Sequence, residues 1–280
     1  MPCHICVTCG VQHAESDRPP AACSICEDER QYVGWGGQRW TTVPDMAGRY
    51  RNQLDDQEPG LASLRTEPHF GIGQRAFLVQ TPAGNLLWDC LSLIDEESVA
   101  ALAERGGIDA IAISHPHFYG TCVEWSAAFG DAPVYIHRAD APWVMRPSSS
   151  VVLWDGETAE PLPGLTLVHL GGHFDGAAVL HWPAGAGGRG ALLTGDTIQV
   201  VMDRRFVSFM WSYPNLVPLK PEQVTAIASR MAGYDFDRMY GAFEGRSVLG
   251  DAAAALSRSA ERYLKRMGAG PGGLEGRRGA

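Results

Sequence analysis

The chain has 280 residues, of which 45% are hydrophobic, so it can bury one large core and carry a small appendage. Its net charge of -9 argues against a nucleic-acid surface, which needs clustered Lys and Arg. No run approaches the roughly 18 apolar residues of a membrane helix, so we expect no membrane segment. The opening residues, Met-Pro-Cys-His, lack the charged and apolar parts of a secretory signal, and we expect a cytoplasmic protein.

The first 31 residues are rich in cysteine. Two Cys-x-x-Cys pairs, Cys6 with Cys9 and Cys23 with Cys26, are separated by 13 residues. In a reducing compartment this pattern predicts a metal site rather than disulfides, and two matched pairs favour a Zn²⁺ ribbon. Cys3 leaves an iron–sulfur cluster open as an alternative. So short a segment has too few large apolar side chains to fold without a metal.

The expected organisation has four parts. Residues 1–31 form the ribbon, and residues 32–66 form a polar, irregular connector in which Trp35 and Trp40 pack at the junction with the core. Residues 67–268 form the catalytic domain, and the Gly/Arg-rich residues 269–280 form a disordered tail. A mobile, partner-binding ribbon is the alternative to a docked one.

Apolar runs and helical patterns alternate within the large domain. Strands are expected over 76–79, 86–90, 110–113, 133–137, 165–170, 177–182 and 191–194, with helices beginning near Asp95, Thr121, Pro221 and Asp251. Aromatic residues over 202–213 suggest either a substrate lid or local packing. This order predicts an α/β fold in which helices cover two stacked sheets.

Chemistry-bearing residues follow three of these strands. His115 and His117 flank a single proline, and alternate side chains of an extended segment point to the same side. His173 follows two glycines after another strand, and Asp196 ends a third. Three imidazoles and one carboxylate are suitable ligands for Zn²⁺ or Fe²⁺.

The order of these motifs resembles the metallo-β-lactamase superfamily over roughly residues 67–245. The resemblance rests on Leu87-Trp88-Asp89, His115-Pro116-His117, Gly172-His173 and Gly195-Asp196. It implies a four-layer αββα sandwich with the metal at the edge where the sheets meet, held by His115, His117, His173 and Asp196.

This chain departs from the family pattern at the second metal position. Tyr119 and Gly120 stand where the family has an aspartate and a histidine, and the family's late histidine is missing, with Glu244 as the nearest substitute. We therefore expect one catalytic metal. A second site rebuilt by Glu244 or Asp175 is the alternative.

The predicted activity is hydrolysis of an ester, thioester, amide or phosphoester of a small molecule. A Zn²⁺ with an open position makes hydroxide available near neutral pH. Asp196, Tyr119 and Glu244 are the candidates for proton transfer. Two other functions remain open: a mononuclear non-haem iron oxidoreductase or dioxygenase acting on a sulfur compound, with the cysteine group as an iron centre, and a degenerate scaffold that binds a partner through its ribbon. The oligomeric state is open.

Overall fold

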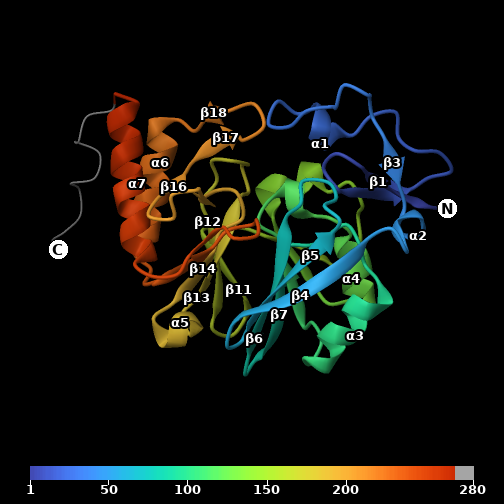
Figure 1. Cartoon of the computed structure of the whole chain (residues 1–280), viewed down its shortest axis with the longest axis horizontal. Coiled ribbons are helices and arrows are strands. Elements are labelled where there is room, and N and C mark those ends of the chain that lie inside the picture. Colours follow the sequence, from blue (N-terminus) through green and yellow to red (C-terminus); the bar gives the residue numbers. More distant parts are fainter. Residues whose placement is uncertain (269–280) are drawn as a thin grey trace.

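Two stacked β-sheets form the centre of the molecule in the computed structural model, which describes residues 1–268 (Figure 1). The predicted disordered tail, 269–280, lies outside the described residues. The first sheet has seven strands in the order β10 (Val151–Trp154), β9 (Val134–His137), β8 (Ala110–Ala112), β7 (Gly84–Trp88), β6 (Arg75–Thr81), β5 (Leu61–Glu67) and β4 (Arg51–Glu58). The second has six in the order β11 (Thr158–Leu162), β12 (Leu165–His169), β13 (Ala178–Trp182), β14 (Ala191–Leu193), β19 (Arg238–Tyr240) and β20 (Ser247–Val248).

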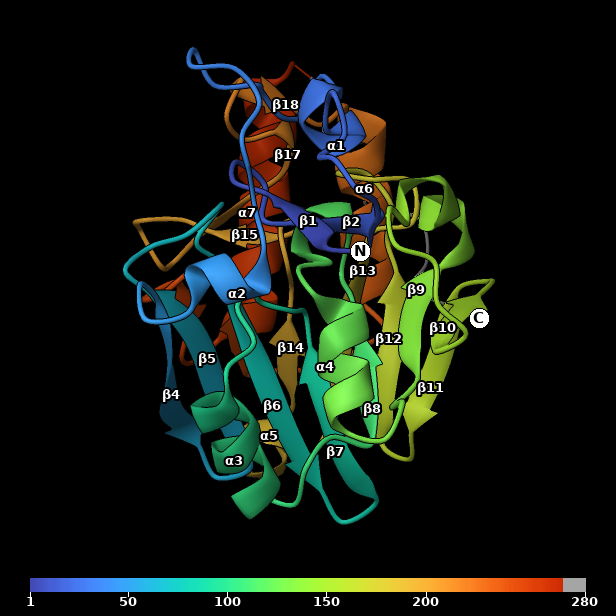
Figure 2. The same cartoon turned by 90° about the vertical axis from the view of Figure 1, so that its right-hand side faces the viewer.

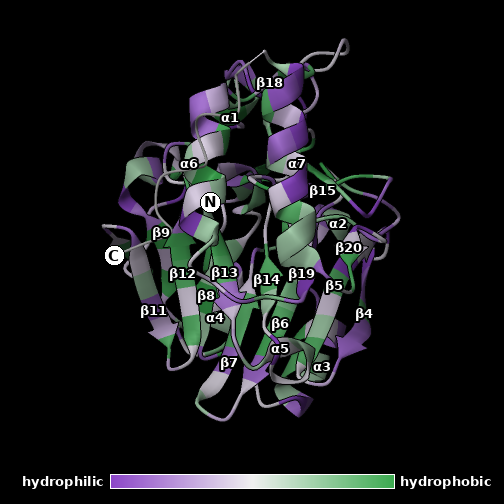
Figure 3. Ribbon diagram, turned by 90° about the vertical axis from the view of Figure 1, so that its left-hand side faces the viewer, coloured by the Kyte–Doolittle hydropathy of each residue, from purple (hydrophilic) through white to green (hydrophobic). Residues whose placement is uncertain are grey.

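Helices cover both outer faces, because parallel neighbours in a sheet need a crossover between them. The pairs β7–β8 and β8–β9 are parallel, and their connections contain α3 (Glu96–Glu104) and α4 (Cys122–Ala128). The parallel pair β14–β19 is joined through α6 (Pro221–Met231), beside which lies α7 (Ala252–Arg266). Hydrophobic residues concentrate on the strands, whereas α7 alternates between the two kinds (Figure 3). The layers are therefore αββα, as expected.

Three buried clusters hold these layers together. The middle one packs the facing sides of the two sheets, with Phe77 and Trp88 from the first and Leu180 and Leu193 from the second. The other two lie under α3 and α4 and under α6 and α7. Burying a large apolar side chain contributes about 2 kcal/mol, so the stacked strands are fixed chiefly by this packing.

The region expected as an irregular connector is mostly regular, which corrects the prediction for residues 32–66. It contains β3 (Trp40–Thr41), the short helix α2 (Val43–Met46) and the paired strands β4 and β5. The sequence of β4, Arg-Asn-Gln-Leu-Asp-Asp-Gln-Glu, is polar because β4 is an edge strand with few buried side chains. Trp35 is fully exposed, so it does not pack at the junction, whereas Trp40 packs edge-on against His13.

The ribbon is docked on the large domain rather than extended from it. It consists of β1 (Cys3–Cys6), β2 (Gln12–Glu15) and α1 (Ser24–Glu27), and it lies above the seven-stranded sheet (Figure 2). The Gln12 amide donates to the Gly120 carbonyl at 3.1 Å, and the Ser92 hydroxyl donates to the Gly10 carbonyl at 2.7 Å. The ribbon cysteines share a buried cluster with Leu91 and other residues of the domain.

Short elements complete the chain around the end of the sheets that carries the predicted ligands. They are η1 (Pro116–Phe118), η2 (Arg138–Trp143), β15 (Gln199–Val200), β16 (Val207–Ser208), β17 (Met210–Ser212) and β18 (Val217–Pro218). The remaining short helix, α5 (Gly185–Gly188), connects β13 to β14 at the opposite end of the sheets (Figure 1). The aromatic residues expected as a lid or as packing thus form β15–β16 and the β17–β18 hairpin. None of the helices within residues 1–268 is both long enough and apolar enough to cross a membrane.

Candidate metal centre

Four side chains from three connecting segments meet at one end of the sheets. His115 follows β8 and His117 lies in η1, whereas His173 follows β12 and Asp196 follows β14. One donor atom from each lies within 4.8 Å of each of the others. Strands of two different sheets therefore bring together the three imidazoles and the carboxylate that the sequence singled out.

These donor atoms are buried and lack protein partners. The three histidines are 1–2% exposed and Asp196 is 5% exposed. No hydrogen-bond partner within the described part of the chain reaches the Nε2 atoms of the histidines or Oδ1 of Asp196. Buried polar atoms are nearly always satisfied, because leaving one unpaired costs about 1–3 kcal/mol. A nitrogen and oxygen donor set that is orphaned in this way fits a Zn²⁺ or Fe²⁺ ion.

Neighbouring groups orient two of the imidazoles. Nδ1 of His173 donates to the Met210 carbonyl at 3.1 Å, and Nδ1 of His115 lies 2.9 Å from the Ser114 hydroxyl. Each contact leaves Nε2 as the free nitrogen, and the bond to the Met210 carbonyl also sets the His173 tautomer that a ligand needs, because a carbonyl can only accept. Burial, the largest cause, lowers the pKa of His173 to about 4 and holds the pKa of His115 and His117 well below the usual value. The rings are therefore neutral, as metal ligands must be.

Asp196 reaches the histidines because Gly195 allows two strand ends to touch. Gly195 has a φ of 51°, and a Cβ built there would lie 2.4 Å from the Ser114 hydroxyl oxygen. Asp196 Oδ2 consequently lies 3.7 Å from Nε2 of His115. Burial raises the pKa of Asp196 to about 7. A bound cation would favour the ionised carboxylate and reverse that shift.

The end of β7 supports the same corner. Asp89, the acidic residue of the first motif, is 1% exposed, and its Oδ1 accepts from the Ser114 amide at 2.7 Å. Burial raises its pKa to about 8. Asp89 thus supports His115 through Ser114, whose amide bonds to Asp89 and whose hydroxyl contacts the His115 ring.

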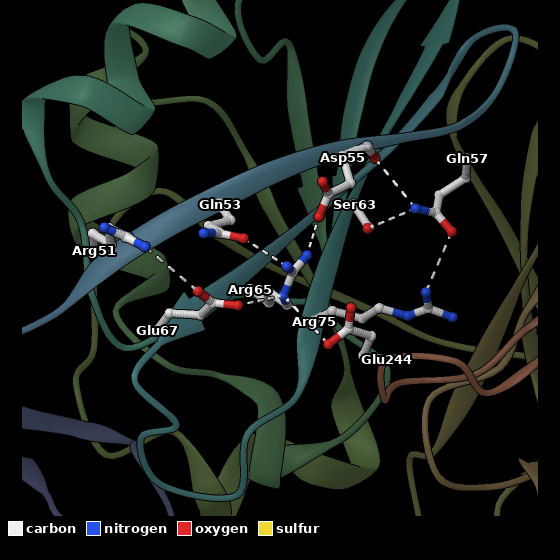
Figure 4. Close-up of polar contacts among 9 residues, drawn as sticks. All are labelled: Arg51, Gln53, Asp55, Gln57, Ser63, Arg65, Glu67, Arg75 and Glu244. Atoms are coloured by element: carbon white, nitrogen blue, oxygen red, sulfur yellow. Dashed lines mark hydrogen bonds and ion pairs between the residues drawn. The ribbon is translucent and has the colours of Figure 1, made fainter.

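Apart from Asp196, the residues expected for a second metal or for proton transfer lie elsewhere. The Tyr119 hydroxyl donates to the Asp140 carbonyl at 3.3 Å, and burial raises its pKa well above 10. Glu244 is 68% exposed and pairs with Arg65 at 3.4 Å, among the charged side chains of β4 and β5 (Figure 4). Asp175 is exposed on the loop after His173. The structure does not bring these three side chains to the four donors.

A histidine cannot be accommodated at the next family position without a rearrangement. Gly120 has a φ of 49°, and a Cβ there would lie 2.4 Å from the Leu91 carbonyl oxygen. The Gly120 carbonyl also accepts from the ribbon through Gln12. Backbone therefore fills the space that a side chain at Gly120 would need.

Asp140 is a buried acid that sequence reasoning missed. It is 1% exposed, and its Oδ1 accepts from the Gly176 amide at 2.7 Å, which ties η2 to the loop carrying His173. Burial raises its pKa to about 7. Its one sequence signal is Gly176, at which a Cβ would lie 2.6 Å from the Asp140 carboxyl carbon.

The four ribbon cysteines form a second group of donors. All four are at most 2% exposed, and their Sγ atoms lie within 4.8 Å of one another. Cys6 and Cys26 are 3.5 Å apart and Cys9 and Cys23 are 3.7 Å apart, close to the ~3.8 Å between sulfurs that share a tetrahedral Zn²⁺ at 2.3 Å. Gln38 Nε2 donates to Cys6 Sγ at 3.1 Å. Cys3 is not a member of the group.

Comparison with known proteins gives one close sequence relative and a shared fold. No protein-family model matches the chain. The uncharacterized protein YmaE of Bacillus subtilis is 51% identical over 269 residues, which cover 95% of this chain and 97% of YmaE. Among solved structures, VMB-1 superposes with a TM-score of 0.60 at 14% identity, over 78% of this chain and 98% of its own. The DIM-1 metallo-β-lactamase gives 0.57 at 13% identity, over 76% and 98%. The chain therefore has the metallo-β-lactamase fold and belongs to the same family as YmaE.

Proposed function

We propose that the chain is a metal-dependent hydrolase in which His115, His117, His173 and Asp196 hold a single Zn²⁺. The convergence of four buried donor atoms that have no hydrogen-bond partner among residues 1–268 carries this proposal. When bound, a Zn²⁺ with an open position supplies Lewis acidity, which activates water and polarises a carbonyl or phosphoryl group. The substrate class is a small ester, thioester, amide or phosphoester.

Asp196 is the proton acceptor that we assign among the three candidates. Tyr119 and Glu244 are engaged elsewhere, whereas Asp196 has Oδ2 3.7 Å from Nε2 of His115 and an Oδ1 that no group of residues 1–268 bonds. Its backbone carbonyl accepts from the Tyr213 hydroxyl at 2.8 Å, which fixes the loop. Asp196 therefore combines the free oxygen and the placement that proton transfer needs.

An iron oxidoreductase is the competing proposal. The same donor set suits Fe²⁺, and the cysteine group suits iron as well as zinc. One observation favours it: the ribbon that carries the cysteines contacts the imidazole centre, because its Arg30 lies 4.4 Å from the centre of the Phe174 ring, which packs against His117. An iron centre in the ribbon would supply electrons across this contact.

Metal analysis and hydrolysis assays separate these proposals. We expect protein purified without added metal to hold two Zn²⁺ per chain and to hydrolyse at least one of 4-nitrophenyl acetate, a nitrophenyl thioester and bis(4-nitrophenyl) phosphate. His173→Ala should lose one Zn²⁺ and lower the rate about 100-fold or more. His181→Ala is the matched control, because His181 is also buried but bonds to the Asp235 carbonyl. If the purified protein holds one equivalent of iron that His173→Ala removes, the oxidoreductase is favoured over the hydrolase. If the centre holds no metal, the chain is a scaffold without catalytic activity.

A further inference from the structure

Arg30, at the end of the ribbon, lies beside the candidate metal centre. Its guanidinium carbon is 4.4 Å from the centre of the Phe174 ring and 5.1 Å from that of Trp211. Phe174 in turn contacts all three imidazoles, with ring centres 4.9 Å from His117 and 5.3 Å from His173. A single aromatic ring therefore connects a cation of the ribbon to the ligands.

Three of the five N–H groups of the Arg30 guanidinium have no partner within residues 1–268. Its Nη1 donates to both carboxylate oxygens of Asp28, at 2.8 and 2.9 Å. The side chain is only 14% exposed, yet Nε is buried without a partner, and Nη2 donates to no group of residues 1–268. The Nε–Nη2 edge is one of the edges through which a guanidinium binds a planar carboxylate with two parallel bonds.

The backbone around Arg30 is held at this place by the β17–β18 hairpin. The Ser212 hydroxyl donates to the Arg30 carbonyl at 2.9 Å, and Asn215 donates to the carbonyls of Glu29 and Gln31 at 3.0 Å each. Met210 of the same hairpin orients His173. A fixed backbone reduces the entropy lost when the side chain binds a ligand.

We propose that Arg30 binds a carboxylate of the substrate, so that the ribbon contributes a specificity-determining residue to the active site. This proposal rests on the proposed function, since it concerns the substrate of that centre. Phe174 and Trp211 pack against the guanidinium, and its Nε–Nη2 edge, which has no partner among residues 1–268, is the edge that we assign to the ligand. The preferred substrates are then small acyl compounds that carry a carboxylate beside the bond to be cleaved.

Two kinds of metal-binding probe test Arg30 without requiring catalysis. Acetohydroxamate binds a metal and carries only a neutral methyl group. The monohydroxamates of malonic, succinic and glutaric acid carry a carboxylate at three different distances from the metal-binding group. Binding to the Zn²⁺-loaded full chain is measured by calorimetry. We expect the best of the three to bind about 10- to 100-fold more tightly than acetohydroxamate, and Arg30→Met to abolish this preference without changing acetohydroxamate binding.

Variants of the Arg30–Asp28 ion pair distinguish binding of the substrate carboxylate by Arg30 from a purely structural role. Arg30→Lys keeps the charge but not the fork, so it should retain only part of the preference. Asp28→Asn leaves Arg30 in place with its charge uncompensated, and it should increase the affinity for the carboxylate probe by about threefold or more. If Arg30 only clamps the ribbon, Asp28→Asn weakens or leaves unchanged the binding of both kinds of probe.

The controls assign each failure to its cause. Arg262→Met removes another arginine stacked on an aromatic ring, Phe206, and should alter neither affinity. Melting temperature and zinc content show whether each variant folds. Equal binding of neutral and anionic probes would overturn the role of Arg30 and leave the metal centre intact. Binding of neither would overturn the metal centre and Arg30 with it.

Discussion

Gly120 decides at the scale of a single residue whether a second metal site can be restored. Gly120→Ala should destabilise the protein by about 3 kcal/mol, because it adds a left-handed backbone cost to a collision with the Leu91 carbonyl. Gly130→Ala should cost only about 1 kcal/mol, since Gly130 has a similar φ of 72° and open space around it. Urea unfolding measures both. Equal losses would show that the Leu91 carbonyl moves aside easily.

Asp140 should make stability depend on pH. Burial raises its folded pKa to about 7, above the ~3.9 of an unfolded chain, so the folded state binds the proton more tightly. The contribution of the protonated Asp140 to the free energy of unfolding is complete below pH ~4 and is lost as the pH rises through ~7. Asp140→Asn should therefore gain stability relative to the wild type between pH 5 and pH 8, by at most about 4 kcal/mol. A difference that stays constant across this range, in urea unfolding, would contradict the raised pKa.

The ribbon is the element whose stability should depend most on its ion. Cys9→Ser should remove one Zn²⁺ per chain and open the segment between residues 15 and 60 to protease, because metal binding supplies the folding free energy of so short a unit. Cys3→Ser is the matched control, since Cys3 lies on β1 outside the ligand group. Metal content and the rate of proteolytic cleavage are the measurements. Unchanged protection in Cys9→Ser would mean that docking alone holds the ribbon.

Some elements and site residues could be predicted from the sequence, and others could not. His115, His173 and Asp196 were found because each follows a short apolar run whose length favours a buried strand, and because the order of their motifs resembles that of the metallo-β-lactamase superfamily. The strand β4 was missed because an edge strand buries too few side chains to produce an apolar pattern. Tyr119 and Glu244 were proposed from their order in a motif, which does not tell where a side chain points. Arg30 gave no signal at all, since its neighbours Phe174 and Trp211 are distant in sequence.

At the scale of the whole molecule, the candidate ion would cross-link the two sheets. His115 and His117 extend from the seven-stranded sheet, whereas His173 and Asp196 extend from the six-stranded one. A ligand at 100 times its Kd stabilises the folded state by about 2.7 kcal/mol. Zn²⁺ should therefore raise the Tm of the demetallated wild type by about 5–10 °C more than that of His173→Ala, in which only the cysteine group can respond. Identical increments in a thermal melt would mean that the ion does not join the sheets.

The β17–β18 hairpin holds both the ribbon backbone and the ring of His173. An ion bound in either centre would therefore restrain the hairpin that also contacts the other centre. Because linkage is reciprocal, any factor by which a filled ribbon strengthens the imidazole centre must also be the factor by which a filled imidazole centre strengthens the ribbon. A coupling factor well above one would make the loading of the two centres cooperative, and protein short of metal would then be a mixture of empty and fully loaded molecules with few half-filled ones.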